Sequence, residues 1–188
     1  MVLAPGITGK DLNPDLLPLK IGRGSATGNL LIVFTTQLDA ESRYLTVNKS
    51  QFGLYLDDER KRMLLHYDYN RDPTNQYPDA HVQVAGGSRT LTRWCKRSGC
   101  TSKELPRLHL PVGGRRFRPT LEDVIEFLII EELARPRDGW EKVIQRHRQR
   151  WSERQVKAVV RRDPISAIAA LTDAGWTISR KDPPQQRG

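Results

Sequence analysis

The first half of the chain consists of short apolar segments separated by polar turns. Residues 29–36 (NLLIVFTT) form a continuous apolar run with β-branched residues, which predicts a buried strand. The segments that follow predict further short strands at residues 43–47, 52–56, 62–69 and 81–85. Asn48-Lys49-Ser50 is predicted to form the turn between the first two of these. Because the turns are tight and polar, the pattern predicts an antiparallel meander of about five strands.

Beyond Gly86-Gly87 the apolar residues recur at helical spacing. Ser88 is predicted to cap a short helix that ends at Gly99, and residues 107–110 predict a short strand. Thr120, followed three residues later by Asp123, predicts a helix start close to a capping box. The helix from residue 120 to residue 133 has a wide apolar stripe, which predicts burial against the sheet. The residues expected to make this contact are Leu121, Val124, Ile125 and Leu128 on the helix, and Leu31, Val33 and Leu65 on the sheet.

Two further helices are predicted after Pro136. The first covers residues 138–161, with a narrow apolar stripe formed by Trp140, Ile144, His147, Trp151 and Ala158. Asp163 and Pro164 are favoured at the N-cap and first position of the second helix, which Gly175 ends. Residues 176–178 predict an edge strand.

Together these elements predict an α+β fold. An antiparallel β-meander of about five strands packs on a helix and is followed by a basic C-terminal helical extension. The expected divisions are a flexible N-terminal arm at residues 1–20, an α+β core domain at 21–136, the basic helical extension at 137–178 and a disordered tail at 179–188. A chain of 188 residues with 37% hydrophobic residues is long enough to bury one ordinary core.

The apolar pattern also predicts a cytoplasmic protein without a membrane segment. The longest apolar run, residues 124–133, is interrupted by three glutamates and is shorter than the roughly 20 residues of a membrane span. The first residues contain no basic segment followed by an apolar block, so no signal peptide is expected. Cys95 and Cys100 could supply only half of a zinc site, and we expect neither a metal nor a cofactor.

The chain is strongly basic, and its charge is uneven. The formal net charge is +9, and residues 137–162 hold nine Lys or Arg against three Asp or Glu. This balance favours polyanionic partners: nucleic acid, an acidic protein or, less strongly, an anionic membrane. Of these we expect nucleic acid, RNA rather than DNA, and no membrane; an acidic or DNA-binding protein is a further expected partner. The arginines of the long helix that are expected to contact phosphates are Arg146, Arg150, Arg154 and Arg161. A charged helix face that is merely solvated would explain the same composition.

A second arginine group precedes the helix that begins at Thr120. Gly113-Gly114 allows the backbone to approach a phosphate, and a helix N-terminus favours anions. The arginines expected to bind nucleic acid here are Arg115, Arg116 and Arg118. The alternative is a turn whose arginines pair with Glu122 or Asp123.

The strands at residues 62–69 and 81–85 carry the main candidate for chemistry. Alternation places His66 and Asp68 on one face of the first strand, and His81 and Gln83 on one face of the second. If the strands pair with their apolar faces together, these four side chains share a polar surface with Arg71 at its rim. Two imidazoles can act as acid and base in phosphodiester cleavage. The predicted catalytic residues are therefore His66, His81, Arg71 and Asp68.

The same residues leave other interpretations open. Tyr69 or Tyr77 could hydrogen-bond a phosphate. The two histidines and Asp68 could instead hold a metal ion, with His109 as a further ligand. A third interpretation is that both histidines hydrogen-bond backbone carbonyls of the hairpin and catalyse nothing.

At LHLPVGGRRFRPTLEDVIEFLI and RRDPISAIAALTDAGWTI, the sequence resembles a widespread, functionally uncharacterised family of actinobacterial proteins. The resemblance covers most of the chain, from about residue 28 to residue 178, and implies no catalytic residues. A weaker resemblance is to small RNA-directed toxins of bacterial toxin–antitoxin pairs. Those proteins have a short antiparallel sheet, a strand end like Tyr67-Asp68, a downstream histidine like His81 and a closing helix. This chain departs from them in its long turn and its basic helical extension.

We therefore expect a basic intracellular protein associated with nucleic acid, acting as a toxin-like RNA-directed enzyme of a bacterial two-gene module. The expected activity is ribonuclease-like or nucleotide-processing. The alternative is a non-enzymatic regulatory protein that binds nucleic acid or an acidic partner protein through its arginine-rich helices. A concave site that unites His66, His81 and Arg71 would favour the enzyme, and a flat or covered hairpin face would favour the binding protein.

Overall fold

The computed structural model describes residues 1–8, 13–21, 27–38, 42, 45–72, 76–99, 105–113 and 118–179. The chain divides into two units, Met1–Arg137 and Asp138–Gly188. Among the described helices, none combines the length and the apolar character that a membrane span requires.

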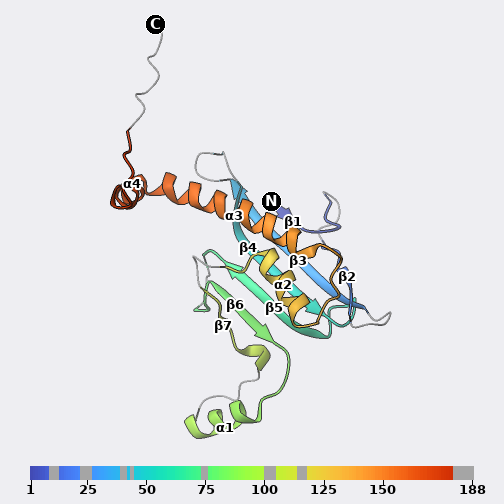
Figure 1. Ribbon diagram of the computed structural model, residues 1–188. Coiled ribbons are helices and arrows are strands. Elements are labelled where there is room, and N and C mark those ends of the chain that lie inside the picture. The colour runs from blue at the N-terminus through green and yellow to red at the C-terminus, as the bar shows by residue number, and fades with distance from the viewer. Residues whose placement is uncertain are drawn as a thin grey trace. The chain divides into compact units, whose positions relative to one another are not determined.

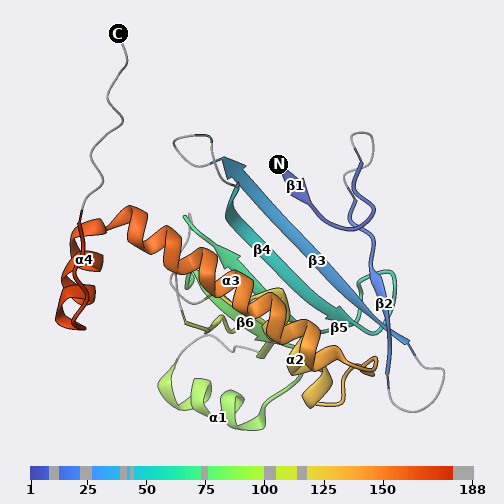
Figure 2. The same ribbon diagram turned by 45° about the horizontal axis from the view of Figure 1, so that its top comes forward.

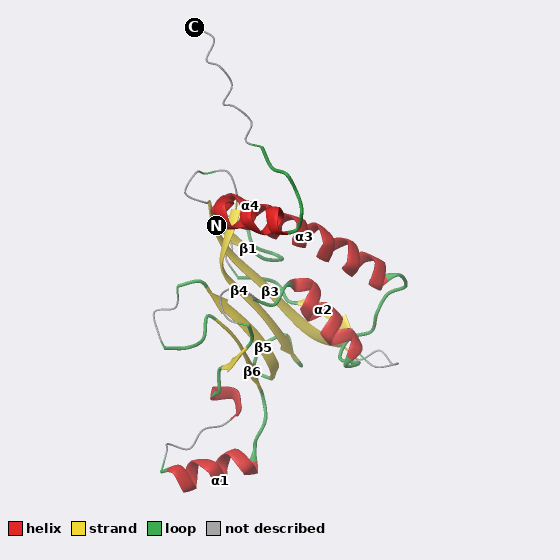
Figure 3. Cartoon of the chain, turned by 60° about the vertical axis from the view of Figure 1, so that its left-hand side comes forward, coloured by secondary structure: helices red, strands yellow, loops and turns green. Residues whose placement is uncertain are grey.

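The first unit is built on one antiparallel sheet of seven strands (Figure 1). Its central strands follow one another in chain order and pair with their neighbours: β3 (Thr27–Leu38), β4 (Leu45–Tyr55), β5 (Met63–Asn70) and β6 (Ala80–Val84). Shorter strands complete the edges: β1 (Val2–Leu3) and β2 (Leu17–Lys20) pair with β3, and β7 (Leu110–Pro111) pairs with β6. Figure 3 shows the central strands lying side by side. The predicted α+β fold with an antiparallel meander is confirmed.

Two segments of the predicted N-terminal arm, residues 1–20, pair with the sheet. Val2 pairs with Thr35, and Leu17 pairs with Leu30. Without them, the outer edge of β3 would present unpaired backbone N–H and C=O groups, and both segments form hydrogen bonds with part of that edge. Pro18 lacks a backbone N–H but lies in an edge strand, where a proline is tolerated. The tail predicted to be disordered, residues 179–188, lies outside the described residues apart from Ser179.

The predicted turn at Asn48-Lys49-Ser50 is instead a β-bulge within one long strand. Thr35 pairs with Lys49 while Thr36 pairs with Val47, so Asn48 is the extra residue of β4. Arg71 holds this bulge from the end of β5. Its guanidinium donates to the Val47 carbonyl from Nε and Nη2, at 3.2 and 3.1 Å, and its backbone N–H donates to the Asn48 carbonyl. Strand pairing on both sides thus overrides the turn preference of the sequence.

One face of the sheet is covered by α2 (Leu121–Ile130), as Figure 2 shows. The buried residues of this core are Leu30, Phe52, Leu54 and Leu65 from the sheet, Val124 and Leu128 from α2, and Ala134 after it. Leu121 packs against the cluster, as predicted. The prediction that Leu31 and Val33 face the helix is wrong, because the alternate residues Leu30, Ile32 and Phe34 do so. The run NLLIVF is apolar on both faces, so alternation could not identify the buried one.

The two predicted caps of this unit are confirmed. Ser88 accepts a hydrogen bond from the Leu91 backbone N–H at the start of α1 (Arg89–Ser98), and Gly99 ends that helix with φ +67°. Thr120 and Asp123 form a reciprocal capping box at the start of α2. The strand predicted at residues 107–110 is shorter: the 3₁₀ turn η1 (Leu105–Arg107) precedes β7.

The second unit consists of α3 (Trp140–Arg162) and α4 (Pro164–Asp173), which turns away from the axis of α3 (Figure 2). Asp163 caps α4 by accepting from the Ser166 backbone N–H, with Pro164 in the first turn. The predicted apolar stripe of α3 is buried only in part: Ile144 is buried and Trp151 half-buried, whereas Ala158 is exposed. The edge strand predicted at residues 176–178 is not formed. Instead, the Trp176 backbone N–H bonds to the Leu171 carbonyl and closes the helix.

Candidate functional site

The β5–β6 hairpin places four polar side chains on the sheet face opposite α2. His66 lies directly across from Gln83, and Asp68 lies directly across from His81. Tyr67, between the two pairs on β5, packs against the core on the other side of the sheet. Because side chains alternate along a strand, the register fixes both pairs on one face, as the sequence predicts.

His66 is held by a hydrogen-bond network on this face. Its Nε2 lies 3.0 Å from Asp68 Oδ2 and 2.7 Å from Gln83 Oε1. Gln83 donates from its own Nε2 to the Pro106 carbonyl, which leaves the amide oxygen facing the imidazole. Both neighbours of His66 Nε2 are acceptors, so this nitrogen carries a proton. Hydrogen bonding to Asp68 raises the pKa of His66 above its usual value, against the opposing effect of burial.

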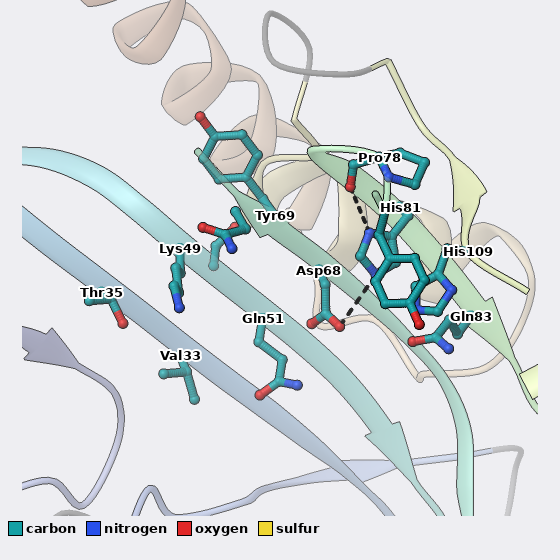
Figure 4. A pocket seen from close by; sticks show the side chains of 13 residues that line it. Val33, Thr35, Lys49, Gln51, Asp68, Tyr69, Pro78, His81, Gln83 and His109 are labelled. Atoms are coloured by element: carbon teal, nitrogen blue, oxygen red, sulfur yellow. Dashed lines mark hydrogen bonds and ion pairs between the residues drawn. The ribbon is translucent and has the colours of Figure 1, made fainter. Parts of the chain in front are cut away.

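His81 contacts the same carboxylate but is oriented by the backbone. Its Nδ1 lies 3.0 Å from the Pro78 carbonyl oxygen, so Nδ1 is the donor in this hydrogen bond. The other nitrogen, Nε2, then faces Asp68 Oδ2 at 3.8 Å (Figure 4).

A third imidazole reaches the site from outside the hairpin. His109 precedes β7, whose Pro111 lies opposite His81. The ring centroids of His109 and His81 are 4.6 Å apart, and Tyr77 stacks on His109 with centroids 3.6 Å apart and planes at 11°. Desolvation, and next the charge of His81, lower the pKa of His109 below its usual value. His109 is thus the imidazole that favours the neutral form.

Asp68, Gln83, His81, His109 and Tyr77 line a pocket of about 360 Å³ (Figure 4). The lining side chains come from four neighbouring strands and from the segments before β6 and β7. They are Val33, Thr35, Lys49, Ser50, Gln51, Asp68, Tyr69, Asn70, Tyr77, Pro78, His81, Gln83 and His109. His66 is not one of them, but it contacts two that are, Asp68 and Gln83. Sequence reasoning missed Lys49 and Gln51, because it placed Lys49 in a turn and left Gln51 between that turn and the strand predicted at residues 52–56.

The predicted catalytic residues therefore converge only in part. Asp68 and His81 line the pocket, whereas His66 stabilises the arrangement from beside it. Arg71 does not line the pocket, and its guanidinium donates to the Val47 carbonyl at the bulge. Of the two tyrosines considered as phosphate ligands, Tyr69 is only 4% exposed.

The predicted nucleic-acid contacts lie on separate elements. Arg115 and Arg116 fall outside the described residues. Arg118 lies 5.7 Å from the centroid of the Tyr69 ring, and burial lowers its pKa. The arginines named on α3, Arg146, Arg150, Arg154 and Arg161, are all exposed.

Metal binding finds no support in the described part of the chain. No group of three or more His, Cys, Asp and Glu residues is arranged there to hold a metal ion. Cys95 is a buried free thiol, and Cys100 lies outside the described residues.

Comparison of the chain with protein-family models, with curated proteins and with solved structures gave no match. The resemblances drawn from the sequence motifs therefore stay predictions, and function is argued from the site alone.

Proposed function

We propose that this protein binds RNA and cleaves it by acid–base catalysis in the pocket on the polar face of the sheet. The observation that carries the proposal is the contact of two imidazoles, His81 and His109, on the wall of that pocket. Cleavage of a phosphodiester needs one group to deprotonate the nucleophile and another to protonate the leaving oxygen. Imidazoles perform both tasks near neutral pH. RNA carries its own nucleophile, the 2′-hydroxyl.

Their surroundings assign the two imidazoles different roles. His109 is the general base, because its lowered pKa keeps it neutral. It takes the proton of the 2′-hydroxyl, whose oxygen forms a bond to phosphorus as the bond between phosphorus and the 5′-oxygen breaks. His81 is the general acid and gives its Nε2 proton to that 5′-oxygen. The Oδ2 of Asp68 lies 3.8 Å from this nitrogen. The products are a 2′,3′-cyclic phosphate and a 5′-hydroxyl.

Two further residues support this assignment. Lys49 lines the same pocket and offers a positive charge to the phosphate. His66 is a positioning residue, because its Nε2 proton binds Asp68 and Gln83. The proposed acid–base pair is therefore His81 with His109, rather than His81 with His66.

The catalytic proposal is tested by incubating the purified protein with labelled single-stranded RNA and identifying the ends of the products. His81→Ala and His109→Ala should each lower the cleavage rate by about 10²–10⁴-fold. His147→Ala is the matched control, because His147 lies on α3 in the other unit and should leave the rate unchanged. The rate should follow a bell-shaped pH profile, with the acidic limb lost in His109→Ala.

Two results would contradict this mechanism. One is full activity in the His81→Ala/His109→Ala double variant. The other is equal cleavage of an oligonucleotide with 2′-deoxyribose at the scissile position, which lacks the nucleophile. Thermal unfolding of each variant separates a loss of chemistry from a loss of folding.

Association with RNA is supported independently by α3. This helix holds eight Lys or Arg and two Glu. Arg146, Arg150, Arg154, Lys157 and Arg161 recur every three or four residues, which places them along one stripe of the helix surface. At a rise of ~1.5 Å per residue the stripe is about 22 Å long, enough to follow several phosphates. We propose that it contacts the nucleic-acid backbone without reading its sequence.

The salt dependence of binding tests this second proposal. Each phosphate contact on a single strand contributes about 0.7 to the slope of log affinity against log salt. Replacing Arg146, Arg150 and Arg154 together by Ala should therefore make the slope shallower by about 2. An unchanged slope would assign the stripe to the alternative partner, an acidic protein.

A further inference from the structure

Tyr77 has no part in the acid–base chemistry, yet it is held flat against one of the two proposed catalytic imidazoles. Its ring lies 3.6 Å from that of His109, with the planes at 11°. It also lies edge-on to His81, with centroids 6.4 Å apart. Nevertheless, 47% of Tyr77 is exposed. An aromatic ring that packs against one neighbour and still offers this much surface can stack on a second planar group.

We propose that Tyr77 is a stacking platform for an unpaired nucleobase, so that the substrate of the pocket is single-stranded RNA. The inference rests on the proposed function and adds the form of nucleic acid that the site accepts. Every base has a flat π-surface, so an exposed tyrosine ring binds bases without selecting among them. In a duplex, each base already stacks on its neighbours and pairs across the helix, so it cannot lie on Tyr77.

The pocket also offers a position for the phosphate backbone of the RNA whose base stacks on Tyr77. Gln51 pairs with Asp68, and Lys49 lies two residues further along β4. That step is about 7 Å along the strand. Both side chains line the pocket that also contains Tyr77. A base on Tyr77 would thus leave its phosphate near the imidazoles, with the next phosphate within reach of the Lys49 ammonium.

The alternative role for Tyr77 is to support His109 and nothing more. The two roles differ in what they do to binding. A tyrosine that only orients His109 would affect the rate of cleavage and leave the affinity for RNA unchanged. A stacking platform would affect the affinity for a strand that has bases, and not for one that lacks them.

The experiment measures binding by fluorescence anisotropy with RNA oligonucleotides in which every ribose is 2′-O-methylated, so that none can be cleaved. The probes are a single strand of ten uridines, the same strand with abasic residues in place of the central bases, and a duplex of equal length. The wild-type protein should bind the strand with bases about 5–150-fold more tightly than the abasic strand. Contacts from α3 to phosphates are common to both strands and cancel in this ratio.

Variants of Tyr77 identify the ring as the cause. Tyr77→Leu should bring the ratio close to one, while Tyr77→Phe should retain it, because phenylalanine preserves the ring. Trp94→Leu is the control, since Trp94 is 70% exposed on α1 and is not a lining residue of the pocket. An unchanged ratio in Tyr77→Leu would overturn the inference. Equal binding of the duplex and the single strand by a variant with Arg146, Arg150 and Arg154 replaced by Ala, which removes phosphate contacts of α3, would overturn it as well.

The outcome is separable from that of the proposed function. If cleavage depends on His81 and His109 but the ratio does not depend on Tyr77, only the stacking inference fails. If the ratio depends on Tyr77 but the wild-type protein cleaves no RNA, the catalytic proposal fails and the pocket is a binding site for single strands.

Discussion

Replacing Leu128 by Ala is expected to be one of the most destabilising single changes in the first unit. Leu128 is 2% exposed and lies in the cluster where α2 meets the sheet. The substitution removes about three methylene equivalents at ~0.8 kcal/mol each, or about 2.4 kcal/mol of transfer free energy. A cavity on the order of 75 Å³, if it does not collapse, adds about 1.8 kcal/mol at ~24 cal/mol per Å³. The free energy of unfolding should therefore fall by about 2–4 kcal/mol, depending on how far the sheet and helix relax.

Ile130→Ala provides the matched control on the same helix, because Ile130 is 64% exposed. It should change the free energy of unfolding by less than about 0.5 kcal/mol. Urea denaturation followed by far-ultraviolet circular dichroism gives both values, and equal slopes against urea would show that the unfolding reaction is unchanged. Equal losses in the two variants, or a loss below about 0.5 kcal/mol for Leu128→Ala, would refute the assignment of α2 to the core.

Two further predictions concern the helix cap and the imidazole network. Thr120→Ala should lower the free energy of unfolding by about 0.5–2 kcal/mol, because it removes the capping box of α2. Thr172→Ala, at an exposed position on α4, is the control and should lower it by less. Because the pKa of His66 is raised, the folded state binds the His66 proton more tightly than the unfolded state does. The stability that His66 contributes is therefore complete below its ordinary pKa of 6.5 and is lost as the pH rises through the pKa of the folded state. The stability difference between the wild type and His66→Gln, measured by denaturation from about pH 5.5 to 8.5, should therefore shrink as the pH rises, and a difference that grows would contradict the proposed contact with Asp68.

The hairpin face could be predicted from the sequence because its two strands alternate clearly. Leu65 and Tyr67 mark the apolar side of β5, and Val82 and Val84 mark that of β6, so the polar residues His66, Asp68 and His81 had to share the other side. The start of α2 was predictable for a similar local reason. Thr120 and Asp123 are close in sequence, and their interaction needs no other part of the chain.

The rest of the site depends on contacts between residues that are distant in sequence. His109 reaches His81 only because β7 pairs with β6 after an intervening helix, and no spacing in the sequence indicates that pairing. Lys49 faces the pocket because β4 continues through it and it lies two residues from Gln51, while its local sequence favours a turn. Arg71 is the converse case. Its position after a strand that carries His66 and Asp68 suggested a phosphate ligand. Its guanidinium donates to the Val47 carbonyl, and Arg71 is not among the residues that line the pocket.

Because of the bulge at Asn48, the chain should tolerate the deletion of one residue at some positions of β4 and not at others. Deleting Asn48 would leave Val47 next to Lys49 and restore a regular ladder with β3, so both neighbouring strands could keep their present partners. Deleting Gln51, only three positions away, would shift part of β4 by one residue and turn side chains of the pocket face toward α2. We therefore expect natural variants of this protein to differ in length at the bulge, and to keep the length of β4 from Lys49 to Tyr55 unchanged.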